Sequence, residues 1–288
     1  MSMRKIPVRH INSTQQQPAF KHFSIRRVED LLQQQELFHD LHRHDFFFIL
    51  ALEQGSGVHE IDFTQYQVAA QSVFFLRPGQ VHQLHLKAGA TGFIMEFNAG
   101  FYHPAEKAAA QRLRKAGNRN FCAMQPGPFQ KLQLVLSYIL QEFTAQEQDS
   151  LDLIKANLDI FFIELLRQSR HTENTAPGNT PYAQERLEEF IELLETHISQ
   201  QKQVAYYTKR MHLSAYQLNE ITKATMDKTS SAIITDHIIL EAKRQLLATS
   251  GQIKDIADQL GYEDPSYFIR FFKKQTGLSP EAFRQHSA

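Results

Sequence analysis

A chain of 288 residues is too long for one ordinary domain and comfortable for two. Apolar residues make up 42% and charged residues 22% of it, which excludes a wholly disordered chain. The formal net charge is zero, so no overall positive charge draws the chain to nucleic acid; from Gln201 onward there are about three more Lys/Arg than Asp/Glu.

Cysteine content and apolar runs narrow the class of protein further. Cys122 is the only cysteine, which excludes an intramolecular disulfide framework and a multi-cysteine zinc site. The longest apolar run, Phe46 to Leu52, is far shorter than the roughly 20 residues that a membrane-spanning helix needs. The N-terminus also lacks the pattern of a secretion signal, so we expect a cytoplasmic protein with no membrane partner.

The first half of the chain has the pattern of a β domain. Residues 1–19 are polar and rich in glutamine, which predicts a flexible tail. Short apolar runs then alternate with turn signals such as Pro78-Gly79, which is typical of an antiparallel barrel or jelly roll. The expected strands are Phe46–Leu52, Val58–Phe63, Tyr66–Val68, Val73–Leu76, Val81–Leu86 and Phe93–Phe97.

Helical periodicity replaces this alternation after about residue 125. Phe129–Phe143 and Leu151–Arg170 each place large apolar residues at helical spacing, which predicts two amphipathic helices that complete a domain over 20–170. Their apolar stripes either cover the barrel or pair with a second copy in a dimer, and periodicity alone leaves both open. Residues 171–181 are rich in Thr, Asn, Pro and Gly, which indicates a linker.

Everything beyond the linker predicts helix, so residues 182–288 form an all-α domain and the fold class is α+β with two domains. The expected helices are Ala183–Ser199, Val204–Met211, Ser214–Thr225, Ser231–Ala248, Ile253–Leu260, Pro265–Thr276 and a short one near Pro280–Arg284.

Two segments of this domain, Val204–Thr225 and Ile253–Gly277, share the layout of a helix–turn–helix unit. In the first, Ser214 is placed to cap the second helix. In the second, Gly261 suits the end of the first helix, and Asp264 followed by proline suits the start of the next. Such units insert their second helix into the major groove of DNA.

The helical wheel separates an inner from an outer face in each second helix. The outward residues, our candidates for DNA contact, are Tyr216, Asn219, Glu220 and Lys223 in the first unit and Ser266, Ile269, Arg270, Lys273 and Lys274 in the second. Arginine reads guanine, asparagine reads adenine, glutamate accepts from cytosine, and lysines suit phosphate. Any solvated amphipathic helix shows charges outside, but two such units in tandem favour DNA binding.

The stretch Leu240–Gln285 resembles the signature of the AraC/XylS family of transcription regulators through nearly its whole length. The matching elements are Glu241-Ala242-Lys243, Ile256-Ala257, Gly261-Tyr262, Ser266-Tyr267-Phe268, Phe272-Lys273-Lys274 and Gly277-Leu278-Ser279-Pro280. The resemblance implies two helix–turn–helix units, bridged by one helix, that enter successive major-groove segments. The first unit departs from the family pattern at Thr222, usually a large apolar residue, and at Asp227, usually glycine.

The N-terminal half resembles the cupin-type sensing domain that often precedes this DNA-binding domain. His42-Arg43-His44 looks like the start of the first cupin motif, and Pro78-Gly79-Gln80-Val81-His82 looks like the second. A barrel lined by apolar residues with a few imidazoles is the usual makeup of a small-molecule pocket. The expected pocket residues are His42, His44, Phe46, Phe48, His82 and Met95.

A metal site is not expected in this pocket, nor is any other cofactor. A metallocupin would need an acid four or five residues after His44, where this chain has Phe48 and Ile49. His85 points to the other face of its strand from His82. An alternative is that the histidines are hydrogen-bonded parts of the barrel wall with no ligand.

Three functions are considered. The first is a sequence-specific transcription regulator that is controlled by an effector in the barrel. We expect an activator, because activation is the commoner behaviour in the family that the chain resembles. Its expected partners are double-stranded DNA, an unidentified small molecule, a second copy bound through helices 129–170, and RNA polymerase. The second is a cupin enzyme with an added helical domain, which lacks its carboxylate and leaves the C-terminal match unexplained. The third is an architectural protein without a ligand. We expect the first, and no enzyme.

Overall fold

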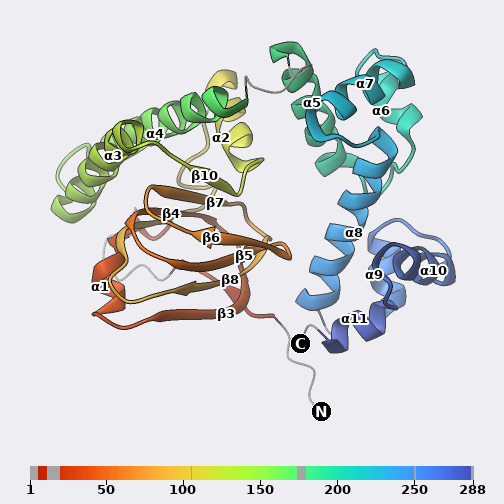
Figure 1. Cartoon of the computed structure of the whole chain (residues 1–288), viewed down its shortest axis with the longest axis horizontal. Helices are drawn as coiled ribbons and strands as arrows, with labels where there is room; N and C mark the ends of the chain where they lie inside the picture. The colour runs from red at the N-terminus through yellow and green to blue at the C-terminus, as the bar shows by residue number, and fades with distance from the viewer. Residues whose placement is uncertain (1–5, 12–19, 105, 174–179, 250, 287–288) are drawn as a thin grey trace. The chain divides into compact units, whose positions relative to one another are not determined.

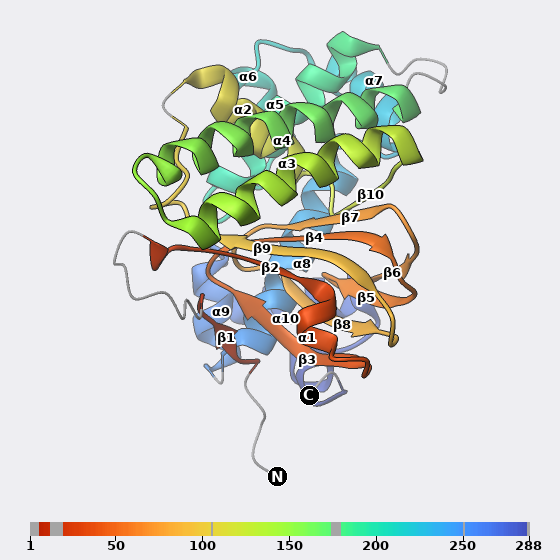
Figure 2. The ribbon, with the colours of Figure 1, turned by 90° about the vertical axis from the view of Figure 1, so that its left-hand side faces the viewer.

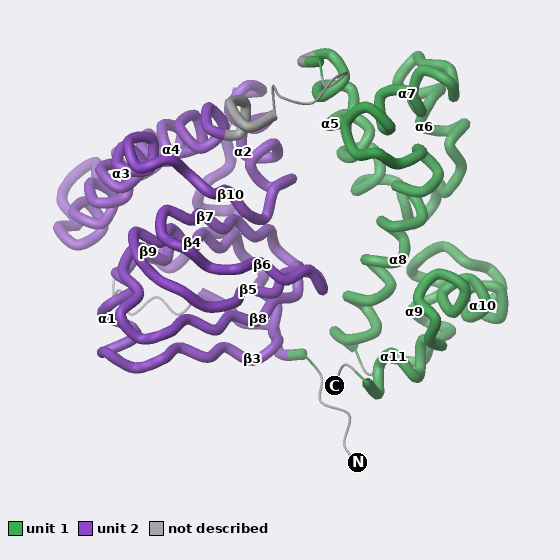
Figure 3. Tube along the Cα trace, viewed as in Figure 1, with its two compact units in different colours: residues 1–6, 173–288 green, residues 7–172 purple. Residues whose placement is uncertain are grey.

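The computed structural model describes residues 6–11, 20–104, 106–173, 180–249 and 251–286. It divides into two compact units, called here the first unit (residues 7–172, purple in Figure 3, where the key reads unit 2) and the second unit (residues 1–6 with 173–288, green, where the key reads unit 1). Among the described residues, the N-terminal part of the second unit is Ile6, whose backbone N–H donates to the carbonyl of Leu247 at 3.1 Å. Each unit is described below by itself.

The first unit is built on two five-stranded sheets (Figure 1). One sheet has the order β1-β3-β8-β5-β6, with β1 (Val8–Arg9), β3 (Leu37–His44), β8 (Val81–Leu86), β5 (Gly57–Ile61) and β6 (Thr64–Val68). The other has the order β10-β7-β4-β9-β2, with β10 (Phe121–Ala123), β7 (Ser72–Leu76), β4 (Phe47–Gln54), β9 (Thr91–Phe97) and β2 (Phe23–Arg27). All pairings are antiparallel except that of β1 with β3.

The core between the sheets follows from alternation along the strands. Phe48, Leu50 and Leu52 of β4 point to this core, together with Leu84 and Leu86 of β8 in the opposite sheet. Because successive side chains of a strand point to opposite faces, Ile49 and Ala51 lie in a second core on the outer face of their sheet. This confirms the predicted barrel-like β domain.

Two long helices, α3 (Pro126–Ala145) and α4 (Ser150–Glu173), cover that outer face (Figure 2). The apolar stripe of each packs on the sheet through Leu132, Leu136, Ile139, Ile154, Leu158, Phe161 and Phe162. Of the two alternatives left open by the sequence, the apolar stripes of α3 and α4 therefore cover the barrel. Two helices were not predicted, the short α1 (Val28–Leu32) and α2 (Lys107–Gly117), whose sequence carries mostly alanine and charged residues.

The expected tail and linker both differ from the structure at their edges. Within the predicted tail, Val8–Arg9 forms β1 and pairs in parallel with β3, because the edge of that sheet offers unpaired backbone groups. Residues 1–5 and 12–19 lie outside the described residues. Within the predicted linker, α4 continues to Glu173 and α5 begins at Pro181, while residues 174–179 lie outside the described residues.

The second unit is helical throughout its described part, as predicted. Its helices are α5 (Pro181–His197), α6 (Val204–Arg210), α7 (Ala215–Met226), α8 (Ser230–Ala248), α9 (Ile253–Gln259), α10 (Pro265–Thr276) and α11 (Pro280–His286). Ser214 forms a capping box with Gln217, and the Asp264 side chain accepts from the N–H of Ser266. No described helix of the chain is both long and apolar enough to span a bilayer.

Local backbone conformation marks where these helices end. Gly261 follows α9 at φ +71° and Gly277 follows α10 at φ +80°, both in the left-handed region that glycine tolerates. Asp227, at the position where the family has glycine, adopts φ +54° after α7. Thr222 is fully buried and its hydroxyl donates to the carbonyl of Asn219 at 3.2 Å, so it satisfies its polar atom locally.

Candidate functional site

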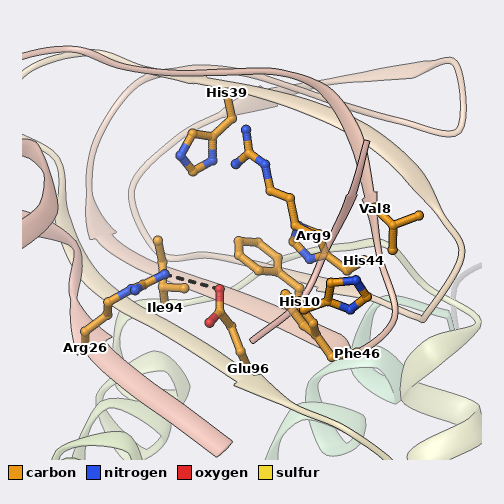
Figure 4. Close-up of a pocket in the computed structure, with 10 residues that line it drawn as sticks. Val8, Arg9, His10, Arg26, His39, His44, Phe46, Ile94 and Glu96 are labelled. Atoms are coloured by element: carbon orange, nitrogen blue, oxygen red, sulfur yellow. Dashed lines mark hydrogen bonds and ion pairs between the residues drawn. The ribbon is translucent and has the colours of Figure 1, made fainter. Parts of the chain in front are cut away.

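A cavity of about 370 Å³ lies in the first unit, between β1, β2, β3, β4 and β9 (Figure 4). Its walls combine apolar rings with charged and imidazole side chains, the mixture that small-molecule sites use. The lining residues are Val8, Arg9, His10, Arg26, His39, His44, Phe46, Phe48, Ile94 and Glu96.

Two arginines and one glutamate give the cavity its charge. Arg26 Nη2 lies 3.2 Å from Glu96 Oε1, and the glutamate side chain is only 9% exposed. Burial raises the pKa of Glu96, while Arg26 opposes that shift. Arg9 extends into the cavity toward His39 (Figure 4). Desolvation lowers the pKa of Arg9, but the pKa of an arginine is so high that the side chain remains cationic. None of the described carboxylates forms an ion pair with Arg9.

Five imidazoles gather beside the cavity, three of them from β3. The pairing of β3 with β8 shifts register between His39 and His42, and this bulge turns His39 to the same side as His42 although they are three residues apart. Their ring centroids are 5.7 Å apart. His82 pairs across from His42 on β8, and His59 comes from β5.

The inner four imidazoles are linked by short contacts. His42 Nδ1 lies 2.6 Å from the carbonyl oxygen of Asp40. His59 Nε2 lies 2.9 Å from His82 Nδ1, and His82 Nε2 lies 3.2 Å from His44 Nε2. These four side chains are almost entirely buried.

Burial keeps this histidine cluster neutral. Desolvation lowers the pKa of His42 to about 4, that of His59 to about 3 and that of His44 to about 2. Desolvation also takes the pKa of His82 well below its usual range, and the neighbouring imidazoles lower it further. At neutral pH each ring therefore carries one proton and one nitrogen lone pair.

The Pro78-Gly79 turn holds His82 in register with β3. Gly79 donates its N–H to the carbonyl of His44 at 2.8 Å. Gln80 is buried, and its amide nitrogen donates to Asp62 Oδ2 at 2.6 Å and to Asn120 Oδ1 at 2.9 Å. The second cupin-like motif is thus tied to the strand that carries the first.

The structure brings together most of the predicted pocket residues, with one correction. His44, Phe46 and Phe48 line the cavity, while His42 and His82 lie in the buried cluster next to it. Met95 does not point inward, and its prediction as a pocket residue was wrong. On β9 the inward positions are Ile94 and Glu96, so alternation sends Met95 into the core under α3 and α4.

Sequence reasoning missed the charged residues of the cavity. Arg9, Arg26 and Glu96 are distant in sequence and meet only through sheet pairing, and Arg9 fell in the predicted tail. His39 was missed because regular alternation places it on the opposite face of the strand from His42, and only the bulge brings the two side chains to the same face. The sequence did offer one signal for His59. It is two residues from the apolar Ile61, so both side chains lie on the same face of β5, which is buried.

In the second unit, the outer faces of α7 and α10 carry the predicted DNA-contact residues. Tyr216, Glu220 and Lys223 are exposed on α7, as are Ser266, Ile269, Arg270, Lys273 and Lys274 on α10. The Arg270 side chain is 70% exposed and forms only a long ion pair, 3.8 Å, with Asp264. Phe268 and Phe272 face the opposite way and are fully buried.

Asn219 differs from this group. Its Oδ1 accepts from the backbone N–H of Ser230 at 2.9 Å and from the Ser230 hydroxyl at 2.8 Å, at the start of α8. Bidentate reading of adenine needs this oxygen to accept from the base. We therefore correct its role from base reader to a residue that joins α7 to α8.

Comparison with protein families matches both units. Residues 29–191 match the AraC-like ligand binding domain, and residues 207–286 match a helix-turn-helix domain. The chain belongs to the AraC family. This confirms the resemblance, and the chain is a DNA-binding transcription regulator with a ligand-binding domain.

Individual relatives in the AraC family are distant but span most of the chain. The transcriptional activator RhaS of Escherichia fergusonii is 25% identical over 247 residues, which cover 85% of this chain and 87% of RhaS. The transcriptional regulator YfiF of Bacillus subtilis is 23% identical over 254 residues, which cover 85% and 78%. The solved structure of ToxT from Vibrio cholerae O395 is 15% identical, with a TM-score of 0.42 and coverage of 92% and 98%.

Proposed function

We propose that this regulator activates transcription, that it reads DNA with the outer faces of α7 and α10, and that a small anionic molecule in the cavity controls it. The observation that carries the DNA-reading part is the pair of capped helices whose apolar side is buried while their polar and cationic side is exposed. A recognition helix needs this division, because the groove accepts only the exposed side.

Sequencing of genomic DNA that co-purifies with the protein tests the proposal. A few enriched sites, bound again in gel-shift assays and lying upstream of genes whose transcription falls when the regulator is deleted, support an activator. Enriched sites whose genes rise on deletion would make it a repressor. DNA without any enriched sequence would contradict sequence-specific reading and favour an architectural protein.

Support for activation comes from the activator RhaS among the relatives. A cytoplasmic location and contact with RNA polymerase belong to the same proposal, because a regulator of this family acts on promoter DNA.

Lys273 and Lys274, exposed near the C-terminal end of α10, are proposed to contact phosphates rather than bases. Replacing either by alanine should weaken binding similarly on every DNA sequence and reduce the slope of log K against log salt by about 1. Gel shifts between 50 and 200 mM salt measure this, with Lys131→Ala on α3 as a control that leaves the slope unchanged. An unaltered slope in the Lys273 and Lys274 variants would remove both lysines from the interface.

The cavity favours an effector with a negative charge and an apolar body. Arg9 lies partly desolvated, and Asp40 and Glu96 stabilise its charge without forming an ion pair with it, so a ligand carboxylate or phosphate in direct contact would offset the cost of its burial. Phe46, Phe48 and Ile94 offer the apolar wall on the other side. Arg26 is already neutralised by Glu96, which leaves Arg9 as the proposed anchor.

Replacing Arg9 by glutamine should therefore weaken effector binding by about 10- to 150-fold, the range for a charge-assisted hydrogen bond. Thermal-shift titration with a panel of organic acids and sugar phosphates, each paired with its neutral amide or alcohol, measures this. Acids should raise the melting temperature of the wild type and of the exposed control Lys87→Gln, but not of Arg9→Gln. Equal stabilisation by the neutral analogues would contradict an anionic effector.

Strand β9 offers a route from the cavity to the helices. Ile94 and Glu96 line the cavity, while Met95 and Phe97 on the same strand pack in the core under α3 and α4. A ligand that favours one position of β9 would bias the packing of these helices, which is the differential interaction that allosteric control requires.

Dimerisation through α3 and α4 is part of the same proposal, now on the face that points away from the sheet. Leu134 and Tyr138 on α3 and Leu153 and Ile160 on α4 are exposed, although they are large and apolar. Exposed apolar groups of this kind mark contact surfaces. Sedimentation of the full chain, with and without effector, tests this part.

A further inference from the structure

Three buried imidazole rings converge on one point of the barrel interior. His42 and His44 of β3 and His82 of β8 each offer a ring nitrogen, and these nitrogens all lie within 4.8 Å of one another. Of the three, only His44 lines the cavity, and the effector proposal gives none of them a role, so it offers no reason for the cluster.

The Nε2 atom of His42 has a free lone pair that could bind a cation. A carbonyl oxygen can only accept, so the Nδ1 that lies 2.6 Å from Asp40 carries the proton of this ring. The lone pair is then on Nε2, which is buried and meets no hydrogen-bond donor among the described residues. An unsatisfied buried acceptor is costly, and a metal ion would satisfy this one.

His59 can fix the tautomer of His82 in the same way. If His82 donates its Nδ1 proton to Nε2 of His59 at 2.9 Å, its Nε2 lone pair faces Nε2 of His44. Metal-binding histidines commonly donate their second nitrogen to such a partner, which holds the tautomer and the ring orientation. His59 would be that partner for His82, as the Asp40 carbonyl is for His42.

The separation of two of these nitrogens matches a tetrahedral ion. Zinc–nitrogen bonds of about 2.0–2.1 Å place two nitrogens of a tetrahedral site about 3.3 Å apart. The Nε2 atoms of His44 and His82 are 3.2 Å apart. Metal ions bind the neutral form of imidazole through a ring nitrogen that carries a lone pair.

The ligand set also selects the kind of metal. The missing carboxylate excludes the two-histidine, one-carboxylate site of non-haem iron, but it does not prevent an all-imidazole site, which suits zinc and its neighbours. We propose that His42, His44 and His82 bind one divalent transition-metal ion of the zinc class, and that His59 positions His82. The proposal depends neither on DNA binding nor on the effector, since metal content is measured directly.

The test uses the full chain without a histidine tag, stripped with a chelator, dialysed, and titrated with Co²⁺ alone and then with Zn²⁺. We expect one equivalent of Co²⁺, visible absorption bands of a tetrahedral site, and loss of those bands when Zn²⁺ displaces it. His42→Ala and His82→Ala should weaken binding by more than about 100-fold, and His59→Leu by about 10- to 100-fold. His85→Ala is the matched control, because His85 lies on the same strand but points outward to Glu36.

Substoichiometric Co²⁺ binding by the folded wild type, or unchanged affinity in folded His42→Ala and His82→Ala variants, would overturn the proposal. If circular dichroism shows that these variants do not fold, X-ray absorption of the zinc-loaded wild type decides. Three imidazole ligands at about 2.0 Å support the site, and an oxygen-only shell refutes it.

Discussion

Replacing Arg270 by alanine is expected to weaken binding to the enriched DNA sites by about 5- to 150-fold, the range for one bidentate arginine–guanine contact of about 1–3 kcal/mol. Arg270 lies on the exposed face of α10 with Ile269 and Lys273, opposite the buried ring of Phe268. Its ion pair with Asp264 is long and exposed, so it stabilises the fold little. The variant should therefore keep the melting temperature of the wild type.

Gel shifts on cognate and base-substituted DNA measure both affinity and specificity for this variant. Arg270→Ala should lose discrimination at one base pair, whereas Lys131→Ala, which removes a cation from α3, should change nothing. Phe272→Ala serves as the opposite control, because it removes a fully buried ring and should destabilise the unit by about 3–5 kcal/mol. If Arg270→Ala binds DNA as tightly as the wild type, α10 is not the reading helix.

Gly261→Ala is expected to destabilise the helical unit by about 3 kcal/mol. Gly261 has φ +71°, where a residue with a Cβ loses about 1–2 kcal/mol. In addition, the added Cβ would overlap the carbonyl oxygen of Ser199, in the segment after α5, and would approach Nζ of Lys202 at 2.8 Å. Overpacking of this kind typically costs about 1–3 kcal/mol more.

Gly277→Ala separates the two causes. Gly277 has a similar φ of +80°, but nothing lies within 4 Å of the position that its Cβ would take. This control should therefore show only the backbone cost, about 1–2 kcal/mol. Urea unfolding followed by helical circular dichroism gives both values, and equal losses in the two variants would contradict a close approach between Ser199 and Gly261.

The family and the order of the elements could be read from local patterns. Apolar residues at helical spacing predicted α3 to α11 apart from their ends, and the Ser214 and Asp264 caps are where the sequence places them. These features depend on residues a few positions apart, so a single segment contains all that determines them. The unpredicted α1 and α2 are the exceptions, since α1 has only five residues and the few large apolar residues of α2 give little periodic signal.

The chemistry of the cavity depended on contacts between distant segments. Alternation gave two faces of β9 but could not say which one faced the cavity, and so Met95 was predicted in place of Glu96. Arg9 and Arg26 come from segments that gave no strand signal. Asn219 looked outward on a helical wheel, yet the start of α8 lies where its side chain can hydrogen-bond.

The amino-acid sequence by itself determined the family, the two-domain order and the exposed face of α10, because the inner and outer sides of a helix follow from 3.6-residue spacing. Only the tertiary structure decided which imidazoles meet. A bulge in β3 turns His39 inward, and the pairing of β3, β8 and β5 brings His42, His82 and His59 within contact distance. Sheet register is set by partners far along the chain, so no local pattern contains it.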